Sequence, residues 1–251
     1  MKYVMSDIHG RYDKYAEMLE QIKFFVEDEL YILGDVIDRG PDGIKILMDI
    51  MNRSNVHMIL GNHELMAIET MIAENEEEVL EKLDLWMWNG GGNTYKDLVD
   101  LSEEKISEIV LFLLELPSFM EIEVKNRKFY LVHGFVGDTK EERVWNRPKL
   151  DTPNLFEDKT LIVGHTPVAL FYGKSNRKIL DYGRTLAARG EHLKIEHAEG
   201  FIDVDCGCGG DIPGARLACL RLDDMKEFYS EEQHEEWLNR MRQRLYGDSS
   251  L

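Results

Sequence analysis

Cysteine is scarce in this sequence, and the few cysteines present do not form a recognisable metal or disulfide pattern. Only three occur in 251 residues, Cys206, Cys208 and Cys219. An odd and sparse set argues against a disulfide framework and is typical of a reducing compartment. Cys206 and Cys208 are separated by one residue, whereas zinc ligands are usually separated by about two to four, and no second pair follows. We therefore expect neither structural disulfides nor a cysteine metal site.

Long hydrophobic runs are also missing. No stretch approaches the roughly 20 apolar residues of a membrane-spanning helix. The apolar start at residues 1–5 reaches Ser6 and Asp7 before it can form the apolar region of a signal peptide. These absences predict a cytoplasmic protein that does not enter a membrane.

Positive charge is in the minority. Lys and Arg number 30 against 48 Asp and Glu, which gives a formal net charge of -18. This imbalance argues against nonspecific nucleic-acid binding, in which Lys and Arg neutralise phosphates, and against an anionic membrane surface. It does not exclude a small anionic substrate, because a buried cation can invert the local field.

The composition that is present, 43% hydrophobic and 31% charged, is that of an ordinary globular protein. A chain of 251 residues can bury roughly three quarters of the surface that its unfolded form exposes. It contains no internal repeat, low-complexity tract or clear linker. We predict a single domain over residues 1–251 and leave its oligomeric state open.

Apolar runs alternate with helical periodicity near the start of the chain. Strands are predicted at 2–5, 30–33 and 56–60, with helices at 12–25 and about 41–51 between them. Strand, helix, strand, helix, strand is typical of a sheet with crossover helices. The pattern therefore predicts an α/β fold with a mixed sheet.

The rest of the chain first continues as helices and then changes to strands. Residues 65–116 read as mostly helical, with a loop at 89–93 whose glycines either let a ligand approach the backbone or only connect two helices. A hairpin is predicted at 119–124 and 128–133, and residues 140–155 are polar with interspersed prolines. Further strands are predicted at 160–163, 178–180, 200–205 and 217–222, and a final helix at 231–245.

Metal-ligating residue types gather where the predicted strands end. Six such residues are Asp7, His9, Asp35, Asn62, His133 and His165. Each histidine alone is better explained as a structural residue, but the six together favour a divalent metal such as Mn, Fe or Zn. Asp7 and His9, two residues apart, are expected to face the same side of a strand. One metal cannot comfortably use all six residues, so two metals sharing Asp35 are predicted.

Four other histidines lack this context and are expected to be structural or surface residues: His57, His192, His197 and His234.

Two carboxylates and an arginine, Asp35, Asp38 and Arg39, emerge together after the second predicted strand. The carboxylates lie too close in sequence for both to be comfortable as bare anions, so positive charge is expected nearby. Arg39 can serve one of them and a metal ion the other. Two plainer interpretations stay open, a turn rich in Asp and Gly and a local ion pair between Asp38 and Arg39.

The order of these motifs resembles the signature of a known family. The motifs are Ser6-Asp7-Ile8-His9-Gly10, Gly34-Asp35-Val36-Ile37-Asp38-Arg39-Gly40, Gly61-Asn62-His63-Glu64, His133-Gly134 and Gly164-His165-Thr166. Together they resemble the phosphoprotein phosphatase family of metallophosphoesterases, and most closely its compact bacterial and phage members of the phage lambda phosphatase type. The family usually has glycine where this chain has Ser6, a change that affects a turn and not a ligand.

The resemblance implies a β-sandwich flanked by helices, with a dimetal site at the carboxyl ends of the strands. One metal would be held by Asp7, His9 and Asp35, and the other by Asp35, Asn62, His133 and His165. In the family the residue matching His63 is the general acid, oriented by the residue matching Asp38. Phosphate would be bound by Arg39 and Asn62, and by a further arginine for which Arg147 is the first candidate and Arg143 the second.

This chemistry suits hydrolysis of a phosphomonoester by metal-activated water, without a covalent phosphoenzyme. Two cations about 3.5–4 Å apart can clamp the attacking and leaving oxygens and lower the pKa of a bound water toward about 7. Manganese is the first choice, with iron or zinc as alternatives. An acid that protonates a poor leaving group contributes about 10²–10⁴-fold.

The expected substrate is a phosphorylated protein or peptide carrying phosphoserine or phosphothreonine, and phosphotyrosine is a further option. The alternative is a diadenosine tetraphosphate hydrolase on the same core, whose groove walls, at residues 86–95 and 138–155, would offer aromatic rings to a base. A third interpretation, a non-catalytic phosphoprotein-binding module, is disfavoured because every expected ligand and the acid are present.

Overall fold

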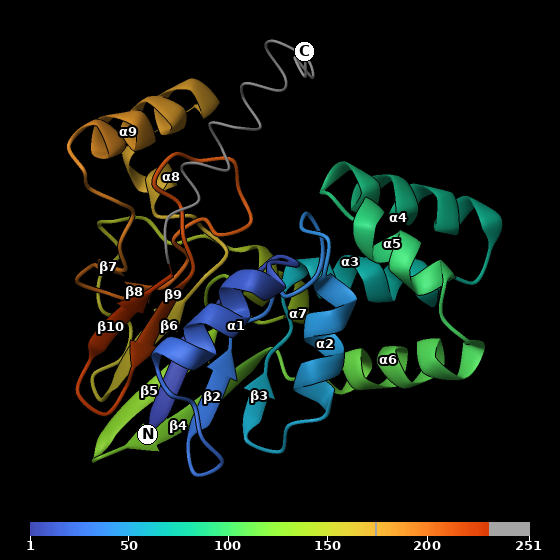
Figure 1. The fold of residues 1–251 in the computed structure, drawn as a ribbon, viewed down its shortest axis with the longest axis horizontal. Coiled ribbons are helices and arrows are strands. Elements are labelled where there is room, and N and C mark those ends of the chain that lie inside the picture. Colours follow the sequence, from blue (N-terminus) through green and yellow to red (C-terminus); the bar gives the residue numbers. More distant parts are fainter. Residues whose placement is uncertain (174, 231–251) are drawn as a thin grey trace, which may run out of the picture.

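Two mixed five-stranded sheets form the centre of the protein (Figure 1). The structure is a computed structural model, and it describes residues 1–173 and 175–230. The first sheet has the order β10-β9-β1-β2-β3 and contains β1 (Lys2–Met5), β2 (Glu29–Ile32), β3 (Val56–Met58), β9 (Ala218–Arg221) and β10 (Lys226–Tyr229). Strands β1, β2 and β3 are parallel, as the strand–helix alternation predicts, and β9 runs antiparallel to β1 and β10.

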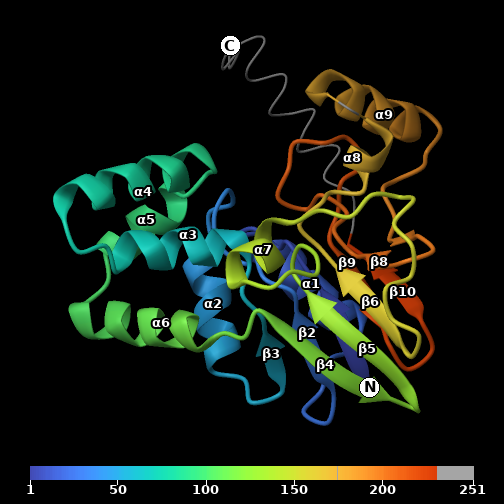
Figure 2. The ribbon, with the colours of Figure 1, turned by 180° about the vertical axis from the view of Figure 1, so that it is seen from behind.

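The second sheet packs face to face with the first. Its order is β4-β5-β6-β8-β7, made of β4 (Phe119–Val124), β5 (Arg127–Val132), β6 (Lys159–Val163), β7 (Glu196–His197) and β8 (Ile202–Asp203). Figure 2 shows β4, β5 and β6 in front of β1 and β2. The predicted hairpin at 119–133 is confirmed as β4 and β5, with Val124 paired to Arg127 across the turn.

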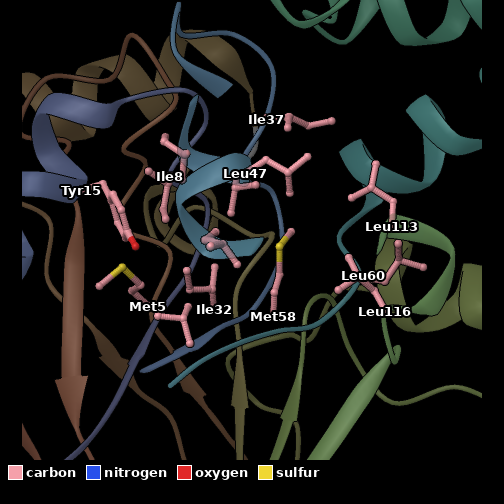
Figure 3. Close-up of a cluster of buried hydrophobic side chains, with 14 of the residues drawn as sticks. Met5, Ile8, Tyr15, Ile32, Ile37, Leu47, Met58, Leu60, Leu113 and Leu116 are labelled. Atoms are coloured by element: carbon pink, nitrogen blue, oxygen red, sulfur yellow. The ribbon is translucent and has the colours of Figure 1, made fainter. Parts of the chain in front are cut away.

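Alternating residues of β1 supply the two sides of the core. Val4 joins a cluster with Leu131 and Ile162 between the two sheets. Met5 points to the opposite face, where it lies in a cluster with Tyr15 of the first helix and Leu47 of the second (Figure 3). Because successive side chains of a strand point to opposite faces, one short apolar strand is buried on both sides.

Nine helices of the described chain flank the sheets. They are α1 (Tyr12–Gln21), α2 (Gly43–Met51), α3 (Asn62–Met71), α4 (Glu76–Trp88), α5 (Gly92–Val99), α6 (Glu103–Glu115), α7 (Lys140–Trp145), α8 (Ala169–Tyr172) and α9 (Asn176–Ala188). Helices α3 to α6 form a separate layer on one side of the sheets (Figure 1) and confirm the helical prediction for residues 65–116. Within it, Asn75 and Ser102 cap α4 and α6 by accepting backbone N–H bonds. The predicted β-sandwich flanked by helices is therefore confirmed.

The strand predicted at 178–180 is wrong, because this segment lies within helix α9. The hydroxyl of Ser175 accepts a hydrogen bond from the backbone N–H of Lys178 and caps the helix. Ile179, Tyr182 and Leu186 then recur at helical spacing and pack on the inter-sheet cluster. The two apolar residues of this segment, Ile179 and Leu180, fit a strand and a helix equally well when the wider spacing is not considered.

Four short elements, α7, α8, β7 and β10, were not expected from the sequence. Helix α7 begins in the polar 140–155 stretch, where Thr139 and Glu142 form a capping box.

The helix predicted at 231–245 lies outside the described residues. Across the described ranges, 1–173 and 175–230, no helix has the length and apolar character needed to span a membrane.

Candidate metal centre and active site

The carboxyl ends of strands from both sheets meet at one place in the molecule. Loops that follow β1 and β2 are joined by backbone hydrogen bonds, including His9 N to Asp35 O at 2.9 Å. Loops that follow β5 and β6 are joined in the same way by Gly164 N to His133 O at 2.8 Å. A bond from the backbone N–H of His165 to Asp7 Oδ2, at 2.9 Å, ties the two pairs together. The motifs that stood apart in the sequence are thus held as one cluster.

Left-handed backbone is concentrated at this cluster. Ten described residues other than glycine have positive φ, and six of them are predicted site residues: Asp7, His9, Asp35, Asp38, Arg39 and His165. Such conformations cost roughly 1–3 kcal/mol each and collect at functional sites, where the surrounding structure imposes them. The expectation that Asp7 and His9 share the face of a strand is therefore wrong in detail. Strand β1 ends at Met5, and both residues lie in the loop beyond it.

A first group of possible metal ligands consists of His9, Asp35 and His63, whose ligand atoms all lie within 4.8 Å of one another. His9 Nε2 lies 3.6 Å from Asp35 Oδ2 and 3.7 Å from Asp7 Oδ1. His9 Nδ1 donates to Ile37 O at 3.1 Å, so the lone pair belongs to Nε2. Burial, and then the charge of Arg39, hold the pKa of His9 well below its usual value, so the ring is neutral. A neutral imidazole with its other nitrogen anchored on a carbonyl is the usual form of a metal-binding histidine.

A second group consists of Asp35, His133 and His165. His133 Nε2 lies 3.4 Å from Asp35 Oδ1 and 2.9 Å from Asn62 Oδ1, while Nδ1 faces Leu33 O at 2.6 Å. Burial opposes the charge of His133, but Asp35 outweighs it and raises the pKa of His133 to about 9. A proton on His133 thus occupies the place between oxygens that a metal ion could take. Burial lowers the pKa of His165 to about 2, so this imidazole is neutral.

The donor set fits divalent cations on two observations. Nε2 of His9 and Nε2 of His165 are buried and have no hydrogen-bond partner among the described residues. Four fully buried carboxyl groups, those of Asp7, Asp35, Asp38 and Glu64, crowd the same loops. Buried carboxylates without a matching number of cations are unstable unless a metal or protons neutralise them. All six ligands predicted from the sequence are brought to this cluster, and Asp35 belongs to both groups.

His63 and Asp38 form a close pair beside the cluster. His63 Nδ1 donates to Asp38 Oδ2 at 2.6 Å, and Arg39 Nη2 donates to His63 Nε2 at 3.1 Å. Asp38 is 0% exposed and directs its carboxylate at His63, not at Arg39, so the simple Asp38–Arg39 ion pair is not what the loop forms. Because a guanidinium can only donate, Nε2 accepts in this arrangement, and it can carry a proton once Arg39 turns to a bound group.

Arg147, the first candidate for the second phosphate ligand, borders the cluster. Its Nη1 donates to His165 O at 2.9 Å and to Thr166 Oγ1 at 3.2 Å. Trp145, two residues earlier, packs edge-on against the His165 ring at 5.9 Å between centroids. Arg143 instead donates to Ser118 Oγ and to Asp138 O, each at 3.2 Å, and neither is a predicted site residue. The geometry places Arg147, and not Arg143, at the rim of the site.

The glycine loop at 89–93 approaches Arg39. The backbone N–H of Arg39 donates to Gly90 O at 2.9 Å, and Asn93 Nδ2 donates to Arg39 O at 3.0 Å. A Cβ on Gly90, whose φ is +102°, would lie 3.0 Å from Arg39 Cγ. Because Gly90 has no side chain, the loop can come close enough to hydrogen-bond the backbone of Arg39.

Glu64 is a site residue that the sequence analysis missed. Its carboxylate accepts backbone N–H bonds from Asp35 at 2.8 Å, Val36 at 2.9 Å and Gly61 at 3.1 Å. Burial, and then the charge of Asp35, raise its pKa to about 7. A glutamate as third residue of α3 was the available signal, because that position commonly accepts from the N-cap backbone. Here it also fixes the loop that carries Asp35.

We expect Gly61→Ala to disrupt the cluster. A Cβ at Gly61 would lie 2.2 Å from Asp35 Oδ1 and 2.5 Å from Glu64 Oε2, so both carboxylates must move. Overpacking of this kind costs about 1–3 kcal/mol, and the moved Asp35 should bind metal more weakly. Gly92→Ala is the matched control, since a Cβ there meets nothing within 4 Å. Thermal unfolding and metal titration should separate the two variants, and equal metal affinity in both would contradict the close fit.

Comparison with known proteins agrees with this geometry. A family model described as Calcineurin-like phosphoesterase matches residues 3–193. Serine/threonine-protein phosphatase 2 of Escherichia coli is 34% identical over 133 residues, which are 52% of this chain and 56% of that protein. The protein of the same name in Salmonella typhimurium is 24% identical over 210 residues, 77% of this chain and 92% of that protein. The symmetrical bis(5'-nucleosyl)-tetraphosphatase of Buchnera aphidicola is 38% identical over 80 residues, 30% of this chain and 29% of that protein.

The fold has relatives among solved structures. The crystal structure of a metallophosphoesterase from Sphaerobacter thermophilus matches with a TM-score of 0.53 and 16% identity, covering 97% of this chain and 93% of that one. At this identity the likeness concerns the fold alone. The matched stretch spans just over half of the Escherichia coli protein and under a third of the Buchnera protein.

Proposed function

This chain belongs to the calcineurin-like phosphoesterase family and is a metallophosphoesterase, a hydrolase of phosphoric esters, and we propose that it acts as a serine/threonine protein phosphatase using two divalent metal ions. The observation that carries the proposal is the position of Asp35, a buried carboxylate shared by two groups of possible ligands. The relatives named serine/threonine-protein phosphatase 2 favour a phosphorylated protein as substrate.

In this proposal one ion is held by Asp7, His9 and Asp35. The other is held by Asp35, Asn62, His133 and His165. When bound, the ions would supply a water of lowered pKa and neutralise charge on the phosphoryl oxygens. The mixed oxygen and nitrogen ligands suit manganese first, with iron or zinc as alternatives.

The protein's own groups bind the substrate and move its proton. Arg39 and Arg147 are both exposed, and their planar guanidinium groups can bind phosphate oxygens. Asn62, which precedes His63 in the chain, would be a further contact. Arg39 Nη2 lies 3.1 Å from His63 Nε2, so a phosphate held by Arg39 has its ester oxygen within reach of this nitrogen. Once Arg39 turns to the phosphate, His63 Nε2 no longer accepts from it and can carry a proton. His63 then gives this proton to the leaving oxygen, and Asp38 keeps the ring oriented through Nδ1.

A second candidate substrate is a dinucleoside polyphosphate. Relatives named as symmetrical bis(5'-nucleosyl)-tetraphosphatases match part of this chain. Trp145 is 38% exposed beside His165, and an exposed aromatic ring there can stack on a base.

A non-catalytic binding module is disfavoured, because the ligand cluster and the His63–Asp38 pair are intact. We also propose a cytoplasmic location, which the sparse and odd-numbered cysteines of the sequence favour.

The test is a side-by-side turnover assay in the presence of manganese, with a phosphoserine peptide in one arm and diadenosine tetraphosphate in the other. A larger kcat/KM on the peptide supports the protein-phosphatase function. A larger value on the dinucleotide moves the chain to the second candidate while leaving the proposed ligands in place. No turnover of either substrate by protein carrying two metal ions would contradict both.

A further inference from the structure

Trp86, near the end of helix α4, is buried beside the proposed acid although it belongs to the helical layer. Its side chain is 1% exposed and packs edge-on against Tyr95, 6.3 Å away between ring centroids. A Cβ on Gly91 would lie 2.6 Å from the indole, so the glycine turn after α4 closes directly over the ring. The ring is therefore held on more than one side.

The polar atom of this ring is directed at the proposed catalytic pair. Trp86 Nε1 donates to Asp38 Oδ2 at 2.8 Å, the same oxygen that accepts from His63 Nδ1 at 2.6 Å. Asp38 Oδ1 is buried and has no hydrogen-bond partner among the described residues. The backbone N–H of Asp38 donates to Thr94 Oγ1 of helix α5 at 2.9 Å. Helix α4 thus hydrogen-bonds the side chain of Asp38, and helix α5 hydrogen-bonds its backbone.

We propose that Trp86 is a positioning residue, whose indole N–H holds the Asp38 carboxylate in the orientation in which it orients His63. This inference rests on the proposed role of His63 as the acid. A carboxylate rotates about its last bond unless its oxygens are fixed. Asp38 Oδ1 has no hydrogen-bond partner in the described chain, so the two bonds to Oδ2 are what fix the carboxylate. Loss of the indole N–H would leave the bond to His63 as the remaining side-chain hydrogen bond of Oδ2. The imidazole would then sample orientations in which Nε2 no longer faces the leaving group.

A purely structural role for Trp86 is the competing explanation. The ring also lines an apolar cavity of about 260 Å³, together with Leu83, Leu98 and Ile106. Truncation to Ala would enlarge this cavity and confuse lost packing with lost positioning. The informative change therefore keeps an aromatic ring and removes only the N–H group.

The experiment compares Trp86→Phe with the wild type on two substrates, an alkyl phosphate and p-nitrophenyl phosphate, with manganese added. The alkyl leaving group needs a proton from the acid, whereas nitrophenolate leaves without one. We expect kcat for the alkyl phosphate to fall about tenfold, kcat for the aryl phosphate to change by no more than about twofold, and KM to stay constant. Tyr15→Phe is the matched control, because it also removes a buried aromatic donor to a carboxylate. The bond that it removes, from the Tyr15 hydroxyl to Asp49 Oδ2 at 3.0 Å, involves no residue of the cluster.

Equal losses on both substrates, or no loss on either, would overturn the positioning role. His63→Asn measured in the same assay separates this inference from the proposed function. If His63→Asn shows the leaving-group dependence and Trp86→Phe does not, only the inference fails. If His63→Asn shows none, the acid itself is wrongly assigned. Should Trp86→Phe not fold, replacement of Trp86 by benzothienylalanine keeps the shape of indole, lacks the N–H group and is expected to show the same split.

Discussion

His63→Asn is expected to reduce kcat for alkyl phosphates by about two or more orders of magnitude while both metal ions remain bound. The asparagine side chain is similar in size to the inner part of the histidine side chain, but it carries no proton that can be transferred at neutral pH. Its backbone N–H still donates to Asp35 Oδ1, a bond of 3.1 Å that holds the loop. The measurement pairs steady-state kinetics with metal content per chain after gel filtration.

The metal content decides between two roles that the geometry allows for His63. Its Nε2 lies 3.8 Å from Asp35 Oδ2, close enough to belong to the first ligand group. If His63 is a ligand, His63→Asn loses about one ion per chain together with activity on every substrate. If it is the acid, the ions stay and good leaving groups are spared. His197→Asn is the matched control, because His197 is exposed and bonds Glu227 at 2.8 Å on the molecule's surface.

The cluster could be predicted from the sequence because its residues directly follow apolar runs. Parallel strands end at one edge of a sheet, so side chains that follow β1, β2 and β3 must come near one another. The same reasoning brought His133 and His165 together after β5 and β6. That the two edges face each other follows from the packing of the two sheets, which periodicity did not indicate and the family resemblance supplied.

The contacts around the cluster could not be predicted in this way. The bond between Trp86 and Asp38 joins residues 48 positions apart and depends on how helix α4 packs, which no local pattern encodes. Glu64 was visible as a capping residue, but its bonds to the Asp35 loop require the left-handed turn at Asp35. The backbone of Asp7 and His9 departs from the strand for the same reason. Tertiary packing imposed local conformations that the residues alone do not prefer.

Asp35→Asn is expected to abolish the binding of both metal ions, and with it turnover of every phosphate ester. The backbone N–H of His63 donates to Oδ1, so asparagine must place its oxygen there and its amide nitrogen at the position of Oδ2. That nitrogen would face His9 Nε2, 3.6 Å from Oδ2 in the wild type, and would offer hydrogens where an ion needs a lone pair. The neutral oxygen that remains attracts an ion near His133 far less than a carboxylate does. The loss of metal affinity should exceed the roughly 10–100-fold that removal of an outer hydrogen-bond partner costs.

A stability measurement makes the Asp35 experiment independent of catalysis. A ligand that binds the folded state alone stabilises it by about 2.7 kcal/mol at 100 times its Kd, so manganese should raise the melting temperature of the wild type. Asp35→Asn should fold without metal, because it removes one charge from a crowded group of buried carboxylates, and its melting temperature should not respond to manganese. Asp158→Asn, at an exposed position paired with Lys128, is the control and should respond as the wild type does. A wild-type response in Asp35→Asn would mean that the two ligand groups do not share this carboxylate, and a dimetal centre bridged by Asp35 would then be wrong.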